Sequence, residues 1–122
     1  MNIEEMQDRT DAVYESLRAL NHATLGQSLP APVVYELLGS LKQAAGALSQ
    51  LARQLGHGLE RSLITYDVYD DNRDPAVSVA MAVHALTVAA DQSHHTGNAL
   101  ATAQSAINLQ GYNLPSVAEV TR

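Results

Sequence analysis

The residues with the most recognisable chemical spacing are three oxygen-bearing side chains near the middle of the chain. Asp70, Asn72 and Asp74 form the pattern D-x-N-x-D, which supplies the first three side-chain ligands of an EF-hand calcium loop. The rest of that loop is missing, since Pro75 stands where its tight turn needs Gly and Met81 where a bidentate Glu closes the coordination shell. A solvated acidic loop, with Asp74 capping the next helix, explains the same residues, and we favour it over a calcium site.

A second group of candidate metal ligands lies further along the chain. His84, Asp91 and His95 are separated by seven and four residues, so they share one face of a helix on which a divalent metal would bind. No fourth ligand is expected to converge on them. Asp91 and His95 also have the spacing of a surface pair on a helix, with His94 in solvent. We favour this pair, and expect neither a metal nor a cofactor.

Other catalytic signatures are missing from the sequence. The chain has no Cys, so thiol catalysis, thiolate metal ligands and disulfides are excluded. Ser, His and Asp are present, but none lies in a nucleophile-elbow sequence, and there is no Gly-rich phosphate loop. The sequence therefore favours a non-enzymatic protein. A metal-dependent helical enzyme that uses His84, Asp91 and His95 is the least favoured alternative.

The charge of the chain limits its partners. The 122 residues carry a formal charge of −6, concentrated in the acidic residues of 1–20 and of 67–74. Because no cluster of Lys or Arg is present, we expect binding to neither nucleic acid nor anionic membranes. The N-terminus lacks the pattern of a signal peptide, and the uncharged span 92–118 is too polar to cross a bilayer. We expect a cytoplasmic protein.

The longest apolar pattern predicts a helix over residues 32–62. Its stripe consists of two series with seven-residue repeats, Val34, Leu41, Leu48 and Leu55, and Leu37, Ala44 and Leu51, flanked by Leu38, Ala45, Ala52 and Leu59. So wide a stripe is expected to face more than one neighbouring helix, which favours a bundle over a two-stranded coiled coil. Gly39 and Gly46 lie on the opposite face and indicate either a second packing surface or positions without a structural role.

Two further helices are predicted on either side of this one. The first spans residues 3–23, begins at the capping residue Asn2 and carries one narrow apolar stripe. The third spans residues 75–110, begins at the Asp74-Pro75 cap and is expected to end at Gly111. Residues 26–30 read as a turn and residues 64–69 as an extended connection.

Part of the sequence resembles a known group of proteins. Residues 21–24, Asn-His-Ala-Thr, and residues 29–39, Leu-Pro-Ala-Pro-Val-Val-Tyr-Glu-Leu-Leu-Gly, resemble small, mostly uncharacterised helical proteins of actinobacteria. The resemblance extends through Leu63 and the Asp74-Pro75 helix start. It implies an all-helical fold and a bacterial cytoplasmic setting, and because its motifs are structural it implies no catalytic residue.

The predicted fold is an all-α, antiparallel three-helix bundle with two long helices. It forms one domain over residues 1–111, followed by a tail of residues 112–122. Because the first helix is shorter by about ten residues, a monomer leaves part of the groove between the other two uncovered. The residues around that groove are Leu51, Leu55, Leu59, Val79, Val83 and Leu86.

The uncovered groove predicts self-association. Burying about 600 Å² of apolar surface contributes some 15 kcal/mol before the costs of association. We expect a homodimer built on the second and third helices, and hence a non-enzymatic interaction or scaffold module. The main alternative is a regulatory partner subunit of a larger bacterial protein. The tail is an alternative cover for the groove, through Leu114, Val117 and Val120, and whether the acidic loop 67–74 binds anything stays open.

Overall fold

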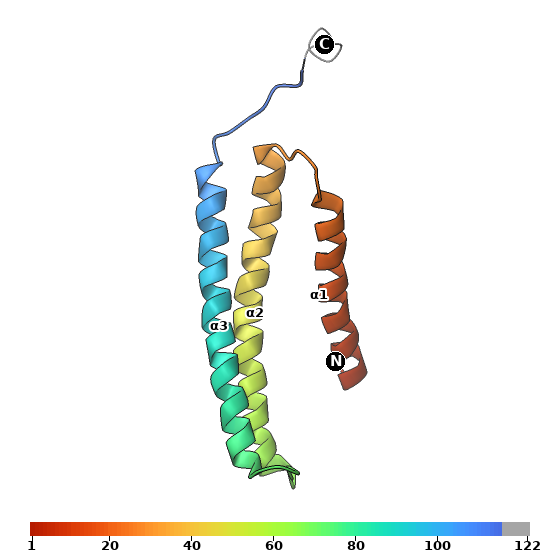
Figure 1. Ribbon diagram of the computed structural model, residues 1–122, viewed down its shortest axis with the longest axis vertical. Coiled ribbons are helices and arrows are strands. Elements are labelled where there is room, and N and C mark those ends of the chain that lie inside the picture. Colours follow the sequence, from red (N-terminus) through yellow and green to blue (C-terminus); the bar gives the residue numbers. More distant parts are fainter. Residues whose placement is uncertain (116–122) are drawn as a thin grey trace. The chain divides into compact units, whose positions relative to one another are not determined.

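The chain is all-α and contains three helices in the computed structural model, which describes residues 1–115 (Figure 1). They are α1 (Ile3–Thr24), α2 (Ala31–Thr65) and α3 (Pro75–Ala106), and no strand occurs among the described residues. The all-α, three-helix fold class predicted from the sequence is confirmed. The chain divides into two compact units, Met1–Pro30 and the part that begins at Ala31. The single domain over residues 1–111 stays a prediction.

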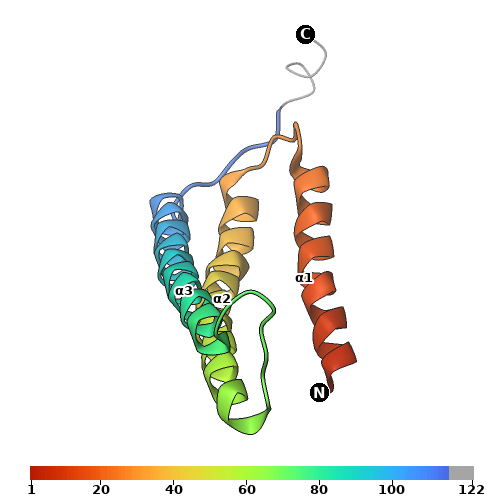
Figure 2. The same cartoon turned by 60° about the horizontal axis from the view of Figure 1, so that its bottom comes forward.

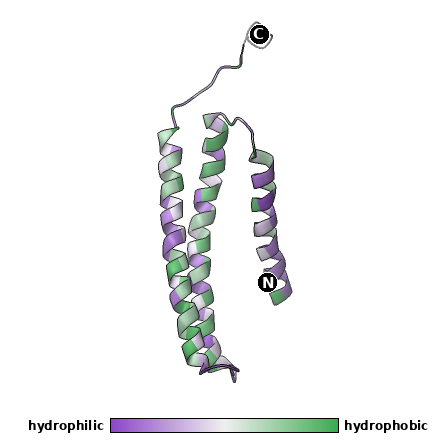
Figure 3. Cartoon of the chain, in the orientation of Figure 1, coloured by the Kyte–Doolittle hydropathy of each residue, from purple (hydrophilic) through white to green (hydrophobic). Residues whose placement is uncertain are grey.

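The first unit is an amphipathic helix with a capped start. Asn2 Oδ1 accepts a hydrogen bond from the Glu5 N–H at 2.8 Å, which confirms the predicted cap. The helix ends at Thr24, and Gly26 has a φ of +69°, a left-handed conformation that Gly adopts without strain. The apolar side chains of its predicted stripe are exposed: Ile3, Met6, Val13, Leu17 and Leu20. Figure 3 shows how hydrophilic residues dominate the remainder of this helix.

In the second unit, α2 and α3 lie side by side and antiparallel, joined by the non-helical residues 66–74 (Figures 1 and 2). The predicted start of α3 is confirmed, since Asp74 Oδ1 accepts from the Ala76 N–H at 3.0 Å and Pro75 is the first helical residue. α2 continues through Gly56 and Gly58 to Thr65, so neither glycine ends it. The connection was predicted to begin at residue 64. It begins at Tyr66 instead and extends to the Asp74 cap.

Small side chains form the line along which α2 packs against α3. This small-residue seam consists of Ala45, Ser49, Ala52 and Gly56 from α2 and Ala90, Ser93 and Gly97 from α3. Ala90 is 0% exposed, and a methyl group at Gly97 would lie 3.5 Å from both Ala45 Cβ and the Lys42 carbonyl oxygen. Side chains this small let the two backbones approach closely and pack with few gaps.

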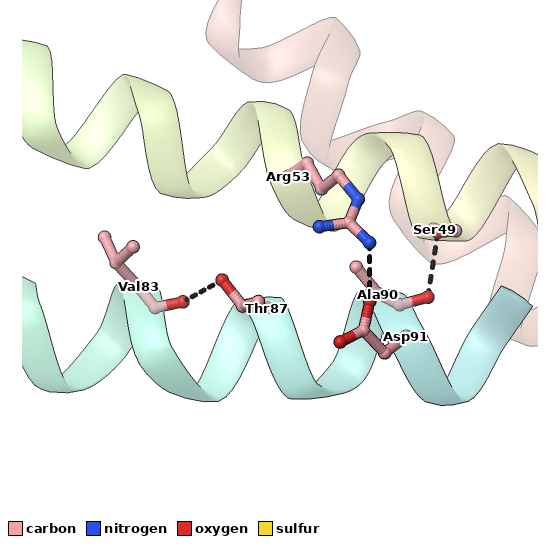
Figure 4. A network of polar contacts seen from close by, with 6 residues as sticks. All are labelled: Ser49, Arg53, Val83, Thr87, Ala90 and Asp91. Carbon is pink, nitrogen blue, oxygen red and sulfur yellow. Dashed lines mark hydrogen bonds and ion pairs between the residues drawn. The ribbon is translucent and has the colours of Figure 1, made fainter.

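Two serines bind across the seam in opposite directions. Ser49 Oγ donates to the Ala90 carbonyl oxygen at 2.8 Å, as Figure 4 shows, and Ser93 Oγ donates to the Ala45 carbonyl oxygen at 2.6 Å. Both bonds are buried, and each contributes about 1 kcal/mol to stability. They also set the register of the hairpin, because Ser49 must lie level with Ala90, and Ala45 level with Ser93.

A polar cluster extends the same contact toward the start of α2. The buried Gln104 side chain donates from Nε2 to the Tyr35 carbonyl oxygen at 3.1 Å and accepts from Lys42 Nζ at 2.8 Å. A methyl group at Gly39 would lie 3.0 Å from Gln104 Nε2, whereas one at Gly46 would meet nothing within 4 Å. Gly39 therefore belongs to the α2–α3 contact itself and not to a second packing surface.

The end of α3 differs from the prediction. The helix ends at Ala106 and not at residue 110, because Ile107 and Asn108 turn to bond the carbonyl oxygens three residues before them. Counting along both helices from the level of Ser49 and Ala90 places Asn108 level with Ala31, the first residue of α2. Beyond this point α2 offers α3 no further residues to pack on, so periodicity alone overestimates the length of α3.

The alternative in which the tail covers the groove is wrong for Leu114, whose side chain is 82% exposed. Val117 and Val120, the other residues of the proposed tail cover, lie outside the described residues.

Candidate functional site: an uncharged face of the hairpin

The predicted calcium ligands are occupied in closing the loop before α3. Asp70 Oδ2 accepts from Ser78 Oγ at 2.6 Å, and Oδ1 accepts from the backbone N–H groups of Asn72 at 3.0 Å and Arg73 at 3.3 Å. The Ser78 bond first, and then the Asn72 bond, hold the pKa of Asp70 below its ordinary value. Asp74 is the cap of α3. Among the described residues, no group of three or more acidic or His side chains is placed to hold a metal ion.

The residues of the second metal candidate do not converge either. Asp91 Oδ1 lies 2.6 Å from Arg53 Nη2 of α2, an ion pair that joins the two helices (Figure 4). The predicted pair between Asp91 and His95 is wrong, because Arg53 takes the carboxylate and the His95 ring lies edge-on to His94 with centroids 6.0 Å apart. His84 is exposed beside an open apolar hollow along the start of α3.

The seam divides the surface of the hairpin into two sides with different chemistry. Residues that directly follow seam positions turn toward one side, and the Arg53–Asp91 pair marks it. Because α2 and α3 run in opposite directions, the residue after a seam position points to the same side of the hairpin on both helices. Residues that directly precede seam positions therefore share the opposite side, which we call the uncharged face. They are Ala44, Leu48, Leu51 and Leu55 of α2, with Ala89, Gln92 and Thr96 of α3, and none carries a charge.

Leucines project from the α2 half of the uncharged face. We call them the leucine ridge: Leu48, Leu51 and Leu55, together with Leu59, which lies one helical turn beyond Leu55, with exposed fractions of 57%, 47%, 53% and 37%. Because they occupy the flank of α2 next to the small-residue seam, α3 does not cover them. Their exposed parts together amount to about two whole leucine side chains.

The α3 half of the uncharged face carries alanines instead. Ala85 and Ala89 are exposed and Ala82 is half-buried, and we call these three the alanine strip. Ser49 lies level with Ala90. Leu51 is two residues beyond Ser49 and Ala89 is one residue before Ala90, so the leucine ridge and the alanine strip occupy the same stretch of the hairpin. The α2 half of the uncharged face therefore projects further from the hairpin than the α3 half.

The six residues predicted to surround the uncovered groove have different positions in the hairpin. Leu51, Leu55 and Leu59 lie on the exposed leucine ridge. Val79, Val83 and Leu86 are half-buried, and a methyl group at Gly56 would lie 3.8 Å from the side chains of Val83 and Leu86, so these two pack against α2 at the seam. The sequence pattern does not single out the alanine strip, whose only signal is position: Ala82 and Ala85 directly precede Val83 and Leu86, which pack on α2, and Ala89 directly precedes the seam residue Ala90.

Searches of protein-family models, curated proteins and solved structures find no match to this chain. In the part of the chain that the structure describes, none of the helices has the length and apolar character needed to span a membrane.

Proposed function

We propose that this chain is a non-enzymatic helical interaction module that acts by associating with a second copy of itself through the uncharged face. The observation that carries the proposal is the leucine ridge, a row of half-exposed leucines on a face that has no charged side chain. A contiguous exposed apolar patch is a common mark of a protein interaction site. A cytoplasmic, bacterial setting, as the actinobacterial resemblance implies, is part of the same proposal.

The energy available supports a reversible dimer. Fully burying one leucine contributes about 1.5–3 kcal/mol, so covering the ridges of both copies, about four whole leucines, gives roughly 6–12 kcal/mol. Association costs about 4 kcal/mol or more in lost freedom of motion. At the upper end of this range the surplus is about 8 kcal/mol, which corresponds to a dissociation constant of about 1 μM, and we expect association in the micromolar range. The uncharged face adds little opposing cost, because no Lys, Arg, Asp or Glu has to be desolvated.

The charged side of the hairpin is less suited to this contact. It carries the Arg53–Asp91 pair, in which both side chains are about half exposed, at 46% and 59%. Burying this pair would remove water from both charged groups. Arg53 bonds one of the two Asp91 carboxylate oxygens, so the other oxygen would need a new partner to replace its hydration. Association through the uncharged face leaves the pair in solvent.

The test compares two neighbouring substitutions that introduce the same charge. Leu51→Glu places a carboxylate on the leucine ridge, whereas Gln50→Glu places it at an exposed position on the other side of α2. Light scattering during size-exclusion chromatography of the full chain gives the mass of each. We expect Leu51→Glu to elute as a 13.0 kDa monomer and Gln50→Glu to associate as the unmodified chain does.

Circular dichroism of both variants checks that the helices are retained. The proposal fails if the unmodified chain stays monomeric at high micromolar concentration, or if Leu51→Glu associates as strongly as Gln50→Glu.

A further inference from the structure

The uncharged face has a shape that is complementary to itself. The leucine ridge projects from α2, and the alanine strip beside it on α3 is low. A second copy therefore presents both the large side chains and the low surface that receives them. This inference rests on the proposed function, since it concerns how two copies meet.

Two kinds of twofold axis can bring two such faces together. If the axis runs parallel to the helices, α2 of one copy lies over α3 of the other, and leucines face alanines. If it runs across the helices within the interface, α2 lies over α2 and α3 over α3, so leucines face leucines and alanines face alanines. Both arrangements are isologous, as most homodimers are.

We propose that the twofold axis runs parallel to the helices, so that the leucine ridge of each copy packs on the alanine strip of the other. Protein interfaces pack at the density of interiors, and facing layers interdigitate well when large side chains lie opposite small ones. With leucine against leucine, the ridges hold the two copies apart, and the alanine strips face each other across a gap. Such a gap forfeits dispersion contacts over half of the face.

This axis also fixes which residues meet. Rotation about an axis parallel to the helices leaves every residue at its own height along the bundle. Counting six residues on from Ser49 and six back from Ala90 places Leu55 level with His84, next to Ala85. Counting two places Leu51 level with Val88, next to Ala89. The expected neighbours across the dimer are therefore Leu55 with Ala85, and Leu51 with Ala89.

The result is a four-helix arrangement in which each helix is antiparallel to both of its neighbours. α2 contacts α3 of its own copy through the small-residue seam and α3 of the other copy through its leucines. The two faces of α2 thus have separate partners, which accounts for a stripe wider than one neighbour needs. Antiparallel four-helix bundles use the same succession of contacts.

Cysteine cross-linking tests this arrangement cleanly, because the chain has no Cys of its own. The full-length variants Leu55→Cys and Ala85→Cys are mixed in the reduced state and then oxidised, and the linked species are identified by mass spectrometry. A disulfide needs Cα atoms within about 7 Å, so we expect the mixed disulfide to exceed each same-variant disulfide at least tenfold. Leu51→Cys with Ala89→Cys is the second pair, and Gln50→Cys with Ala89→Cys is the control that should not link.

Light scattering of the same reduced variants separates this inference from the proposed function. If the unmodified chain and the cysteine variants are all monomeric, the proposed function fails. If they are dimeric but the disulfides join two Leu55→Cys chains or two Leu51→Cys chains, or if neither pair gives a mixed disulfide, self-association stands and the axis parallel to the helices is wrong.

Discussion

Enlarging Ala90 should separate α2 from α3, because this residue is fully enclosed at the small-residue seam. Ala90 is 0% exposed, and its carbonyl oxygen accepts the buried hydrogen bond from Ser49. The substitution Ala90→Leu adds three carbon atoms where no space exists. Overpacking costs about 1–3 kcal/mol, and moving the helices apart weakens the two serine bonds, each worth about 1 kcal/mol. We expect a total loss of about 2–4 kcal/mol in the free energy of unfolding.

Urea unfolding followed by circular dichroism measures this loss. With a slope of about 2 kcal/mol per M, the midpoint should fall by about 1–2 M. The matched control is Ala99→Leu, which makes the same change at an exposed position of α3 and should alter stability by less than about 0.5 kcal/mol. All samples are compared at one protein concentration, since association also stabilises the fold. Equal midpoints for the two variants would refute the tight seam.

Three further predictions concern the polar contacts. Removing either seam hydroxyl, by Ser49→Ala or Ser93→Ala, should lower the free energy of unfolding by about 1 kcal/mol, because each variant loses one buried hydrogen bond. Urea unfolding measures this loss, and midpoints identical to that of the unmodified chain would contradict the hydrogen bonds. Breaking the exposed Arg53–Asp91 pair by Asp91→Ala should cost at most about 1 kcal/mol, and less in high salt, because solvent and ions screen it; a double-mutant cycle with Arg53→Ala that shows a larger coupling would contradict this. Asp70 has a pKa lowered below 3.8 in the folded chain, so its bonds stabilise the fold fully above that value and the effect is lost as pH falls through the folded pKa; the stability difference between the unmodified chain and Asp70→Asn should be constant from about pH 5 to 8 and vanish in stronger acid, and a difference that grows on acidification would contradict it.

The parts of the fold that depend on neighbouring residues could be predicted from the sequence. Asn2 and the Asp74-Pro75 pair start helices because their side chains or ring act on backbone groups within the first turn. The end of α3 could not be predicted in this way. It depends on where α2 begins, which is a tertiary fact that heptad spacing does not contain.

The contact through the small-residue seam could not be predicted from hydrophobic periodicity, for a different reason. Hydrophobic periodicity gives Leu more weight than Ala, Ser or Gly, so the predicted stripe is centred on the leucines of α2 and does not single out the small residues as the contact with α3. Close backbone approach favours the small residues instead, and Ser49 and Ser93 add hydrogen bonds that no apolar pattern reveals. The leucines are displaced to the flank, where Leu51 and Leu55 form half of the candidate site.

The remaining parts of the site involve residues far apart in the sequence. Asp91 has a potential partner four residues away in His95, and the local spacing favoured that pair, yet Arg53 binds it from the other helix. Ala85 and Ala89 carry no signal of their own, because exposed alanines are common on helices. They become part of a face only once the register of the hairpin is known.

The central claim, that the uncharged face joins two copies of the chain, is tested most directly by sedimentation equilibrium of the unmodified full-length protein over a wide range of concentrations. The account predicts an average mass that rises from 13.0 kDa toward twice that value as the concentration passes through the micromolar range. A mass that stays at 13.0 kDa up to high micromolar concentration would contradict it.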